Sequence, residues 1–290
     1  MTLTDQKNHE RAIRLASGGR LPLSHTLVMG VLNVTPDSFS DGGIFREPAR
    51  AVEHALAMER QGADIIDVGG ESTRPGADPV PAGEEIRRVI PVIEGIRRTS
   101  SVPLSIDTFK AATARAALDA GADIVNDISA LRFDEAMAEL LASRQVPVIL
   151  MHMLGTPRTM QIAPSYENCV AEITEFFKER LRYCDSRGID RERVILDPGI
   201  GFGKRLQDNL DILANLREFK KLGQTLLTGT SRKSFINKVN PSDGPASARL
   251  GGSIASMITA AFGGADIVRV HDVAETVEAL KVARAIRKRQ

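Results

Sequence analysis

Short apolar runs alternate along the chain with longer segments that have apolar residues every three or four positions. The short runs have the length of strands, and the longer segments have the periodicity of amphipathic helices. The expected strands are residues 27–32, 65–68, 102–106, 124–125, 146–151, 194–196, 225–227 and 267–268. The expected helices are residues 48–61, 84–98, 110–120, 134–143, 168–187, 208–221, 247–262 and 273–287.

This alternation predicts an α/β protein in which crossover helices connect parallel strands. Eight such units favour a TIM (β/α)8 barrel, with the barrel proper at about residues 25–287, although strand number alone does not exclude an open, doubly wound sheet. Because composition does not change along the chain, residues 1–290 are expected to form a single domain. Before the first unit, alternating apolar residues on both sides of Ser17-Gly18-Gly19 predict an N-terminal β-hairpin, placed to plug the barrel.

One connection between a helix and a strand occurs three times. The sequence Gly-Ala-Asp-Ile occupies residues 62–65, 121–124 and 264–267. Five positions after the glycines stand Asp67, Asn126 and Arg269. Because a repeated connection starts each strand alike, these polar side chains are predicted to lie at a common level, inside the barrel or at its mouth. Asp67 has two possible roles there, as a ligand contact or as the ion-pair partner of a basic residue.

Composition narrows the class of protein. The 290 residues are 42% hydrophobic and carry a net charge of +1, which is typical of a globular chain and gives no broad basic surface for nucleic acid. No apolar run approaches the roughly 20 residues that span a membrane, and the N-terminus lacks the apolar core of a signal peptide, so a cytoplasmic location is expected. Cys169 and Cys184 are too far apart in one expected helix to form a disulfide and are expected to be reduced.

Polar residues follow almost every expected strand, at the end of a barrel where active sites form. They are Asn33, Asp67, Asp107, Asn126, His152 between Met151 and Met153, Asp197, Ser231-Arg232-Lys233 and Arg269-Val270-His271. A single Asp or Asn after a strand is about as often a turn residue or a helix cap. Six or more at one mouth indicate a site.

These residues suit two kinds of ligand group. Acids, an amide and a lysine match the donors and acceptors of a flat heterocycle, and methionines offer it a polarizable wall. A second set suits an anion such as pyrophosphate: Thr73-Arg74, Ser231-Arg232, Arg269 and His271. The segment from Gly199 to Lys204 lacks the first glycine and the Ser/Thr of a P-loop, so Phe202 is expected to supply an apolar contact. Asn33 and Asp37 would suit Mg²⁺ together with a substrate phosphate.

Several longer motifs extend this pattern over about residues 13–287. They are Met29-Gly-Val-Leu-Asn33, Thr35-Pro-Asp-Ser-Phe-Ser-Asp-Gly-Gly43, Gly70-Glu-Ser-Thr-Arg-Pro-Gly76, Ser105-Ile-Asp107, Asn126-Asp127, Met151-His-Met153, Asp197-Pro-Gly199, Ser231-Arg-Lys-Ser234 and Arg269-Val-His271. Together they resemble the dihydropteroate synthase family, whose fold is a TIM barrel. The resemblance implies a transferase of folate biosynthesis that joins p-aminobenzoate to 6-hydroxymethyl-7,8-dihydropterin pyrophosphate, giving 7,8-dihydropteroate and pyrophosphate.

The resemblance and the residue types together assign roles. The pterin would be bound by Asp107, Asn126, Met151, Met153, Asp197, Phe202, Lys233 and Arg269. The pyrophosphate would be bound by Asn33, Thr73, Arg74, Arg269 and His271, and p-aminobenzoate by Phe39, Pro75, Ser231 and Lys233. Mg²⁺ is the expected cofactor, held by Asn33 and Asp37. The expected catalytic residues, in a dissociative, carbocation-like substitution, are Asp107, Lys233, Arg269 and His271.

The expected partners follow from the same resemblance. Sulfonamides, which mimic p-aminobenzoate, are expected to compete with it and to bind more tightly when Mg²⁺ and pterin pyrophosphate are present. A homodimer through the last helices is expected, because the family commonly dimerises and residues 247–264 are rich in small residues beside an apolar stripe. No nucleic acid or membrane partner is expected.

Two other functions stay open. A methyltetrahydrofolate-dependent methyltransferase could use a similar pterin pocket with a corrinoid partner, but its reaction gives no reason for the anion cluster. A non-catalytic paralogue that binds pterin or a protein partner is the second alternative, and only an assay separates it from an enzyme.

Overall fold

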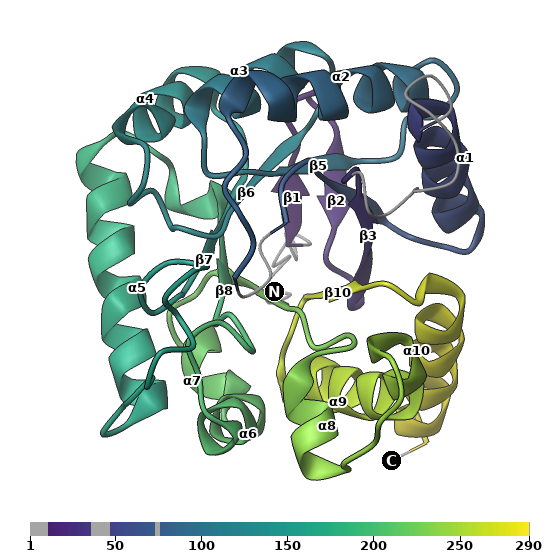
Figure 1. The fold of residues 1–290 in the computed structure, drawn as a ribbon, viewed down its shortest axis with the longest axis vertical. Helices are drawn as coiled ribbons and strands as arrows, with labels where there is room; N and C mark the ends of the chain where they lie inside the picture. The colour runs from purple at the N-terminus through teal and green to yellow at the C-terminus, as the bar shows by residue number, and fades with distance from the viewer. Residues whose placement is uncertain (1–10, 36–46, 73–75, 290) are drawn as a thin grey trace, which may run out of the picture.

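The computed structural model describes residues 11–35, 47–72 and 76–289. Its centre is a closed barrel of parallel strands in the order β10-β3-β4-β5-β6-β7-β8-β9 (Figure 1). The strands are β3 (Leu27–Asn33), β4 (Ile65–Gly69), β5 (Leu104–Asp107), β6 (Ile124–Asp127), β7 (Val148–Met151), β8 (Val194–Asp197), β9 (Thr225–Thr228) and β10 (Ile267–Val270). The predicted TIM barrel is confirmed, and the alternative of an open, doubly wound sheet is wrong. A single domain over residues 1–290 stays a prediction.

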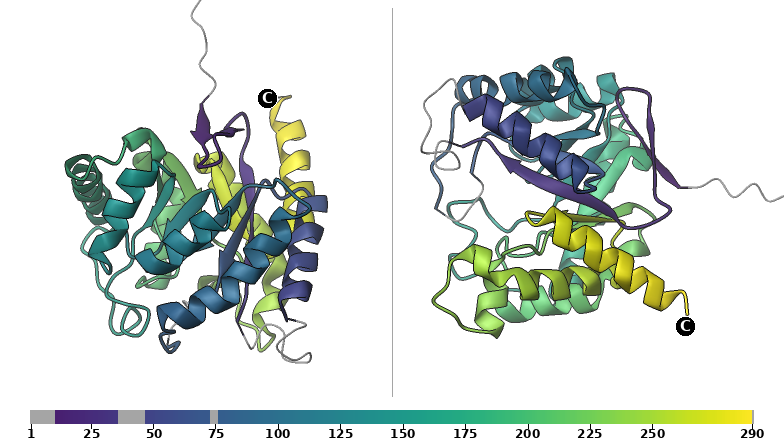
Figure 2. Two further views of the ribbon diagram at one scale, coloured as in Figure 1. Left: turned by 90° about the horizontal axis from the view of Figure 1, so that it is seen from above. Right: turned by 90° about the vertical axis from the view of Figure 1, so that its right-hand side faces the viewer.

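Helices surround this barrel on the outside (Figure 2). They are α1 (Glu47–Arg60), α2 (Ala82–Arg97), α3 (Ala111–Asp119), α4 (Glu135–Arg144), α5 (Cys169–Ser186), α6 (Leu206–Ala214), α7 (Leu216–Lys220), α8 (Ser234–Val239), α9 (Leu250–Gly263) and α10 (Val273–Arg287). No helix in the described ranges is long and apolar enough to cross a membrane. Cys169 and Cys184 are buried free thiols, as expected.

The helices differ from the expected ones in three details. The helix expected over residues 208–221 is divided into α6 and α7, because Asn215 has non-helical angles, with φ −120° and ψ 26°. The short helix α8 was not predicted, since six residues are too few to show a helical period. The helix expected from residue 247 begins with a 3-10 turn, Ala246–Arg249, before α9.

The repeated Gly-Ala-Asp-Ile connection starts three strands in the same way. Its glycines have positive φ angles, which other residues adopt only with strain: 98° at Gly62, 110° at Gly121 and 112° at Gly264. Each aspartate accepts a hydrogen bond from the backbone near the start of a neighbouring strand: Asp64 from Val28 N at 2.8 Å, Asp123 from Leu104 N at 3.1 Å and Asp266 from Leu226 N at 2.8 Å. These carboxylates therefore hold adjacent strands in register.

The amino-terminal half of the barrel interior is an apolar layer, called here the floor. It consists of Leu27, Met29, Ile65, Ile124, Ile149, Ile195, Leu227 and Ile267. The predicted hairpin is confirmed as β1 (Ala12–Arg14) paired with β2 (Arg20–Pro22). Its Ile13 is 2% exposed and packs against the floor, so the hairpin closes this end of the barrel.

Candidate active site

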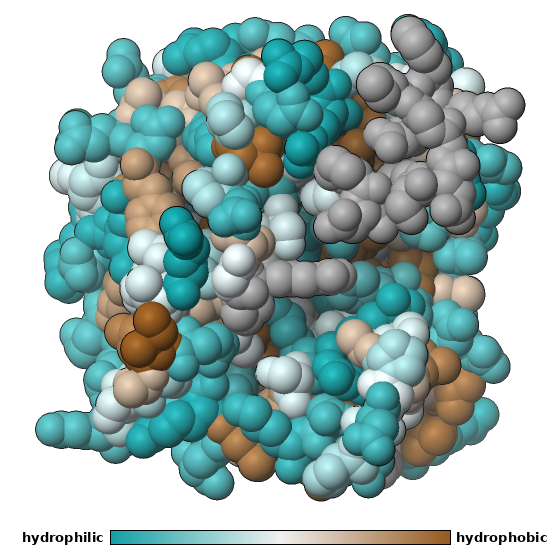
Figure 3. All heavy atoms as spheres, viewed as in Figure 1, coloured by the Kyte–Doolittle hydropathy of each residue, from teal (hydrophilic) through white to brown (hydrophobic). Residues whose placement is uncertain are grey.

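The carboxyl-terminal ends of the strands surround a pocket at the mouth of the barrel. It is lined by Val31, Asp107, Asn126, Ile128, Met151, Asp197, Gly199, Ile200, Phe202, Gly229, Ser231, Lys233, Arg269 and His271. Figure 3 shows this side of the molecule, where mostly hydrophilic residues surround a hollow near the centre. Most lining residues end a strand or follow one, so the closure of the barrel brings together side chains that are far apart in the sequence.

Three side chains of this pocket that carry a carboxylate or an amide are buried, Asp107, Asn126 and Asp197. Burial raises the pKa of Asp107 to about 7, although Arg269 beside it acts in the opposite direction. Burial also raises the pKa of Asp197, whose Oδ1 accepts a hydrogen bond from Gly199 N at 2.8 Å. The Oδ1 of Asp107 has no hydrogen-bond partner among the described residues. A buried acid with a free acceptor oxygen is suited to bind the N–H groups of a ligand.

The three residues that the repeat singled out contact one another inside the barrel. Asp67 Oδ2 accepts hydrogen bonds from Arg269 Nε at 2.6 Å and from Asn126 Nδ2 at 3.1 Å. Arg269 Nη2 also donates to Asp107 Oδ2 at 2.8 Å. Burial opposes the charge of Arg269, but Asp67 and Asp107 outweigh that effect and raise its pKa. The predicted common level is confirmed, and so is the ion pair considered for Asp67.

A lysine and an apolar wall form another side of the pocket. Lys233 precedes α8, and its Nζ lies 4.1 Å from the centre of the Phe202 ring. Burial lowers the pKa of Lys233 to about 8, and Arg269 adds to the effect. Met151 lines the pocket, whereas Met153 is buried in the apolar cluster beside it. Met153 was predicted to contact the pterin, but it lies behind the residues that line the pocket.

Ser231 and His271 lie side by side in the loops after β9 and β10. Ser231 Oγ accepts a hydrogen bond from His271 N at 3.2 Å and lies 3.1 Å from Nδ1 of the same residue. Since the hydroxyl hydrogen is free to be donated to Nδ1, the geometry favours a ring hydrogen on Nε2. Burial, with a contribution from Arg269, lowers the pKa of His271 to about 3, so the ring is neutral. Arg232, expected in the anion cluster, donates instead from Nε to Asp272 at 3.1 Å.

Lys204, at the end of the glycine-rich loop of residues 199–204, is buried, and no sequence pattern indicates its role. Its Nζ donates to the carbonyl oxygens of Phe202 at 3.0 Å and His152 at 3.3 Å, and lies 3.0 Å from His152 Nδ1. Burial lowers the pKa of Lys204 to about 7, and burial together with Lys204 lowers that of His152 to about 2. His152 packs edge-on against Phe176 of α5 and does not line the pocket.

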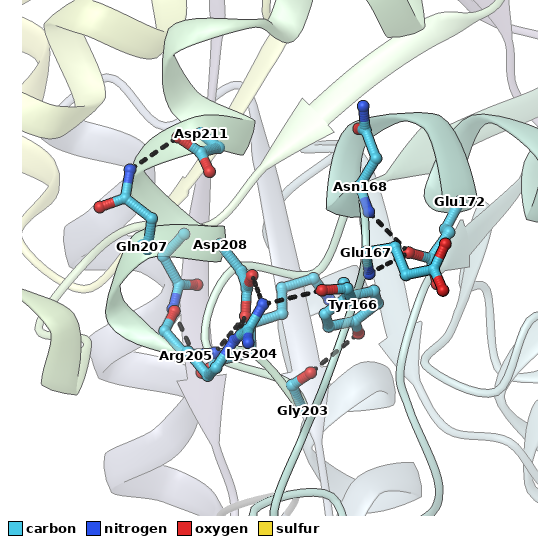
Figure 4. Close-up of polar contacts among 11 residues, drawn as sticks. Tyr166, Glu167, Asn168, Glu172, Gly203, Lys204, Arg205, Gln207, Asp208 and Asp211 are labelled. Carbon is cyan, nitrogen blue, oxygen red and sulfur yellow. Dashed lines mark hydrogen bonds and ion pairs between the residues drawn. The ribbon is translucent and has the colours of Figure 1, made fainter.

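The same loop is held from the side of α5 and α6, as Figure 4 shows. The Tyr166 hydroxyl donates to the carbonyl oxygen of Gly203 at 2.8 Å. Arg205 Nη2 in turn donates to the carbonyl oxygen of Tyr166 at 3.1 Å and to Asp208 Oδ1 at 2.8 Å. These contacts and the Lys204 ammonium fix the backbone that carries Phe202 into the pocket.

Some predicted site residues lie outside the described residues: Asp37, Phe39, Thr73, Arg74 and Pro75. Asn33, predicted for pyrophosphate and Mg²⁺, ends β3, and its Oδ1 and the Asp107 side chain both lie next to Gly69. In the described ranges, no group of three or more His, Cys, Asp or Glu could hold a metal ion. A single amide oxygen at the mouth fits a Mg²⁺ ion that takes its other ligands from phosphate and water.

Several lining residues were not predicted, namely Val31, Ile128, Gly199, Ile200 and Gly229. Alternation along β3 would have placed Val31 inside the barrel, since it stands two positions before Asn33. Gly199 begins the glycine-rich segment that lacks the features of a P-loop. Its φ is +68°, and a Cβ there would lie 2.0 Å from the carbonyl oxygen of His152, so glycine is required. No sequence pattern marks Ile128 or Ile200.

Comparisons with known proteins agree with this geometry. A family model described as pterin binding enzyme matches residues 29–271. The chain is 51% identical to dihydropteroate synthase of Escherichia coli (strain K12) over 273 residues, 93% of this chain and 95% of that protein. It resembles Xanthomonas albilineans dihydropteroate synthase with 4-aminobenzoic acid, with TM-score 0.90, 45% identity and coverage of 96% of this chain and 98% of that one. The complex of that enzyme with 7,8-dihydropteroate gives TM-score 0.86 and 42% identity, covering 95% and 98%. The chain therefore belongs to the dihydropteroate synthase family of transferases.

Proposed function

We propose that this chain condenses 6-hydroxymethyl-7,8-dihydropterin pyrophosphate with p-aminobenzoate, giving 7,8-dihydropteroate and pyrophosphate in folate biosynthesis. The observation that carries the proposal is a set of buried acceptors, Asp107, Asn126 and Asp197, that shares one pocket with Lys233 and Arg269. The acceptors match the amino and ring N–H groups of a pterin. The similar enzymes crystallised with 4-aminobenzoic acid and with 7,8-dihydropteroate support the same pair of ligands.

The proposed reaction is a dissociative substitution at the pterin methylene carbon. The C–O bond to pyrophosphate breaks, and the pyrophosphate oxygen keeps the electron pair. The amine nitrogen of p-aminobenzoate then attacks the cationic carbon and loses a proton to water. The ionised Asp107 stabilises the cationic pterin, while Arg269 and the Nε2 hydrogen of His271 bind the leaving pyrophosphate. Lys233 donates to the pterin from the side of Phe202.

The proposal includes residues that lie outside the described ranges. Asn33 and Asp37 would hold a Mg²⁺ ion together with pyrophosphate oxygens. When bound, the ion would offset the charge that develops on the leaving group. Thr73 and Arg74 would contact the same anion, and the proposed p-aminobenzoate site consists of Phe39, Pro75, Ser231 and Lys233. Sulfonamides would compete for that site.

A direct assay tests the proposed function. Pyrophosphate and 7,8-dihydropteroate should form in equal amounts, only when both substrates and Mg²⁺ are present, and the Asp107→Asn variant serves as the control. Methyl transfer from methyltetrahydrofolate to a corrinoid acceptor would instead support the methyltransferase. Pterin binding without turnover would support the non-catalytic paralogue.

A homodimer through the last helices is also part of the proposal. Val282 and Ile286 of α10 are 55% and 60% exposed, which leaves apolar side chains on the outer surface of this helix. Light scattering at micromolar concentration should give the mass of a dimer, and the mass of a monomer would contradict it. A cytoplasmic location stays a prediction from the sequence.

A further inference from the structure

Asp67 lies between the apolar floor and the pocket, and the reaction proposed above gives it no role. It is 0% exposed and is not among the residues that line the pocket. Ile65, two positions earlier on β4, belongs to the floor, so both side chains point into the barrel. The Oδ2 of Asp67 receives both Arg269 Nε and Asn126 Nδ2. One buried carboxylate therefore contacts two residues of the pocket from beneath.

The hydrogen bond between Asp67 and Asn126 sets the direction of the Asn126 side chain. A carboxylate only accepts hydrogen bonds, so Asn126 turns its Nδ2 toward Asp67 and is left with Oδ1 for the pocket. The Asn126 side chain makes no other hydrogen bond within the described parts of the chain. The pocket thereby presents acceptor atoms from Asp107, Asn126 and Asp197. A reversed amide would place a donor against the N–H groups of a pterin, which are donors as well.

The hydrogen bond between Asp67 and Arg269 anchors the Arg269 side chain. Its Nε is held by Asp67, while its Nη2 occupies Asp107 Oδ2, an acceptor that a pterin would need. A ligand that takes over Asp107 displaces only the far end of the guanidinium, because the near end stays on Asp67. Without Asp67, Asp107 would be the main carboxylate partner of Arg269, and the arginine would compete with the substrate for it.

We propose that Asp67 is a positioning residue for pterin recognition, which fixes the acceptor end of Asn126 toward the substrate and keeps Arg269 from blocking Asp107. The inference rests on the proposed function, since it concerns the pterin site of the same reaction. It assigns Asp67 no contact with the substrate.

The test is an exchange of the two side chains. In Asp67→Asn, residue 67 can donate as well as accept, so Asn126 is no longer required to turn its Nδ2 toward it. We expect the KM for pterin pyrophosphate to rise at least about tenfold while the KM for p-aminobenzoate changes less than about twofold. Asn126→Asp alone places two carboxylates together and should weaken pterin binding at least as much. In the double variant Asp67→Asn/Asn126→Asp, residue 67 donates and residue 126 again turns an oxygen to the pocket. Its KM for pterin pyrophosphate should return to within about fivefold of the wild-type value.

Ser105→Ala is the matched control. Ser105 pairs with Asp67 in the register of β4 and β5, is 0% exposed, and its Oγ has no hydrogen-bond partner in the part of the chain that the structure describes. This variant should leave both KM values unchanged. Thermal denaturation identifies any variant that fails to fold. If a single variant fails to fold, the KM of the double variant for pterin pyrophosphate tests the inference.

Two results would overturn the inference. One is a KM for pterin pyrophosphate in Asp67→Asn that equals the wild-type value, and the other is a double variant no better than the single ones. Calorimetric titration with pterin pyrophosphate measures the same differences without turnover. A wild-type protein that binds this ligand but forms no product would contradict the proposed function and still leave the role of Asp67 testable.

Discussion

The two halves of the barrel interior are built on the same strands but hold opposite kinds of side chain. In the amino-terminal half, Ile65, Ile124 and Ile267 meet in the floor and are 0% exposed. Two residues further along these strands stand three polar side chains joined by hydrogen bonds, Asp67, Asn126 and Arg269. Because side chains alternate along a strand, both sets point to the same interior and differ only in their level along the barrel.

This difference separates the residues that stabilise the fold from those that bind. The floor buries apolar area, which favours folding. The polar level contains oxygens with no hydrogen-bond partner among the described residues, Asp67 Oδ1 and Asp107 Oδ1, and burying such groups is unfavourable. Substitutions at the polar level should therefore lower activity without lowering stability, and substitutions in the floor should lower stability while leaving activity nearly unchanged.

The largest effect is expected at Asp107. Asp107→Asn keeps the shape of the side chain but removes the charge that would stabilise a cationic pterin. The kcat should fall by a factor of roughly 10² to 10³, as for the loss of one preorganised contact. Steady-state kinetics with both substrates, on a variant whose circular dichroism matches wild type, measures the change. A loss of less than about threefold would show that this carboxylate does not stabilise the transition state.

The same variant should be more stable than wild type at neutral and alkaline pH, by on the order of 4 kcal/mol. Burial raises the pKa of Asp107 from 3.8 to about 7 in the folded protein. A raised pKa means that the stability from this group is full below pH 3.8 and is lost as the pH rises through 7. Asparagine has no such proton, so its advantage should grow between about pH 4 and pH 7 and then stay constant. Urea denaturation across this pH range measures the difference in stability. If the ion pair with Arg269 outweighs the effect of burial, the variant would be less stable than wild type.

The pH dependence of activity should have two limbs. Asp107, with its pKa of about 7, becomes ionised as the pH rises, and Lys233, with its pKa of about 8, loses its charge above that pH. The kcat/KM for pterin pyrophosphate should therefore rise through pH 7 and fall through pH 8, by roughly tenfold per pH unit beyond each limb. Lys233→Arg should remove the alkaline limb, because arginine keeps its charge. An alkaline limb that persists in this variant would assign it to another group.

The repeated connection made one part of the site predictable from the sequence. The spacing from glycine to polar residue is the same in three strands, and equal spacing gives equal depth in a barrel. Asp67, Asn126 and Arg269 therefore meet at one level, as predicted. Strand number and hairpin position followed from apolar periodicity in the same way, because both depend on local patterns.

Other features depend on contacts between distant segments and leave no local pattern. Lys204 is buried because the loops after β7 and β8 meet around it. The contact between Arg269 and Asp107 joins residues 162 positions apart. Spacing predicts that such residues share a mouth, but it does not predict which donor finds which acceptor.

The smallest effect on activity is expected in the floor. A substitution there should lower the free energy of unfolding, whereas Asp107→Asn at the polar level should raise it. Ile124→Val removes one methylene group from a residue that is 0% exposed, two positions before Asn126 on β6. The free energy of unfolding should fall by about 0.5 to 1.5 kcal/mol, because a small cavity replaces packed atoms. The kcat/KM should stay within about twofold of wild type, since Asn126 is held by Asp67 and not by the floor. Urea denaturation and steady-state kinetics on one preparation measure both. A loss of activity without a loss of stability would show that the floor positions the pterin pocket, and the division between the two levels would then be wrong.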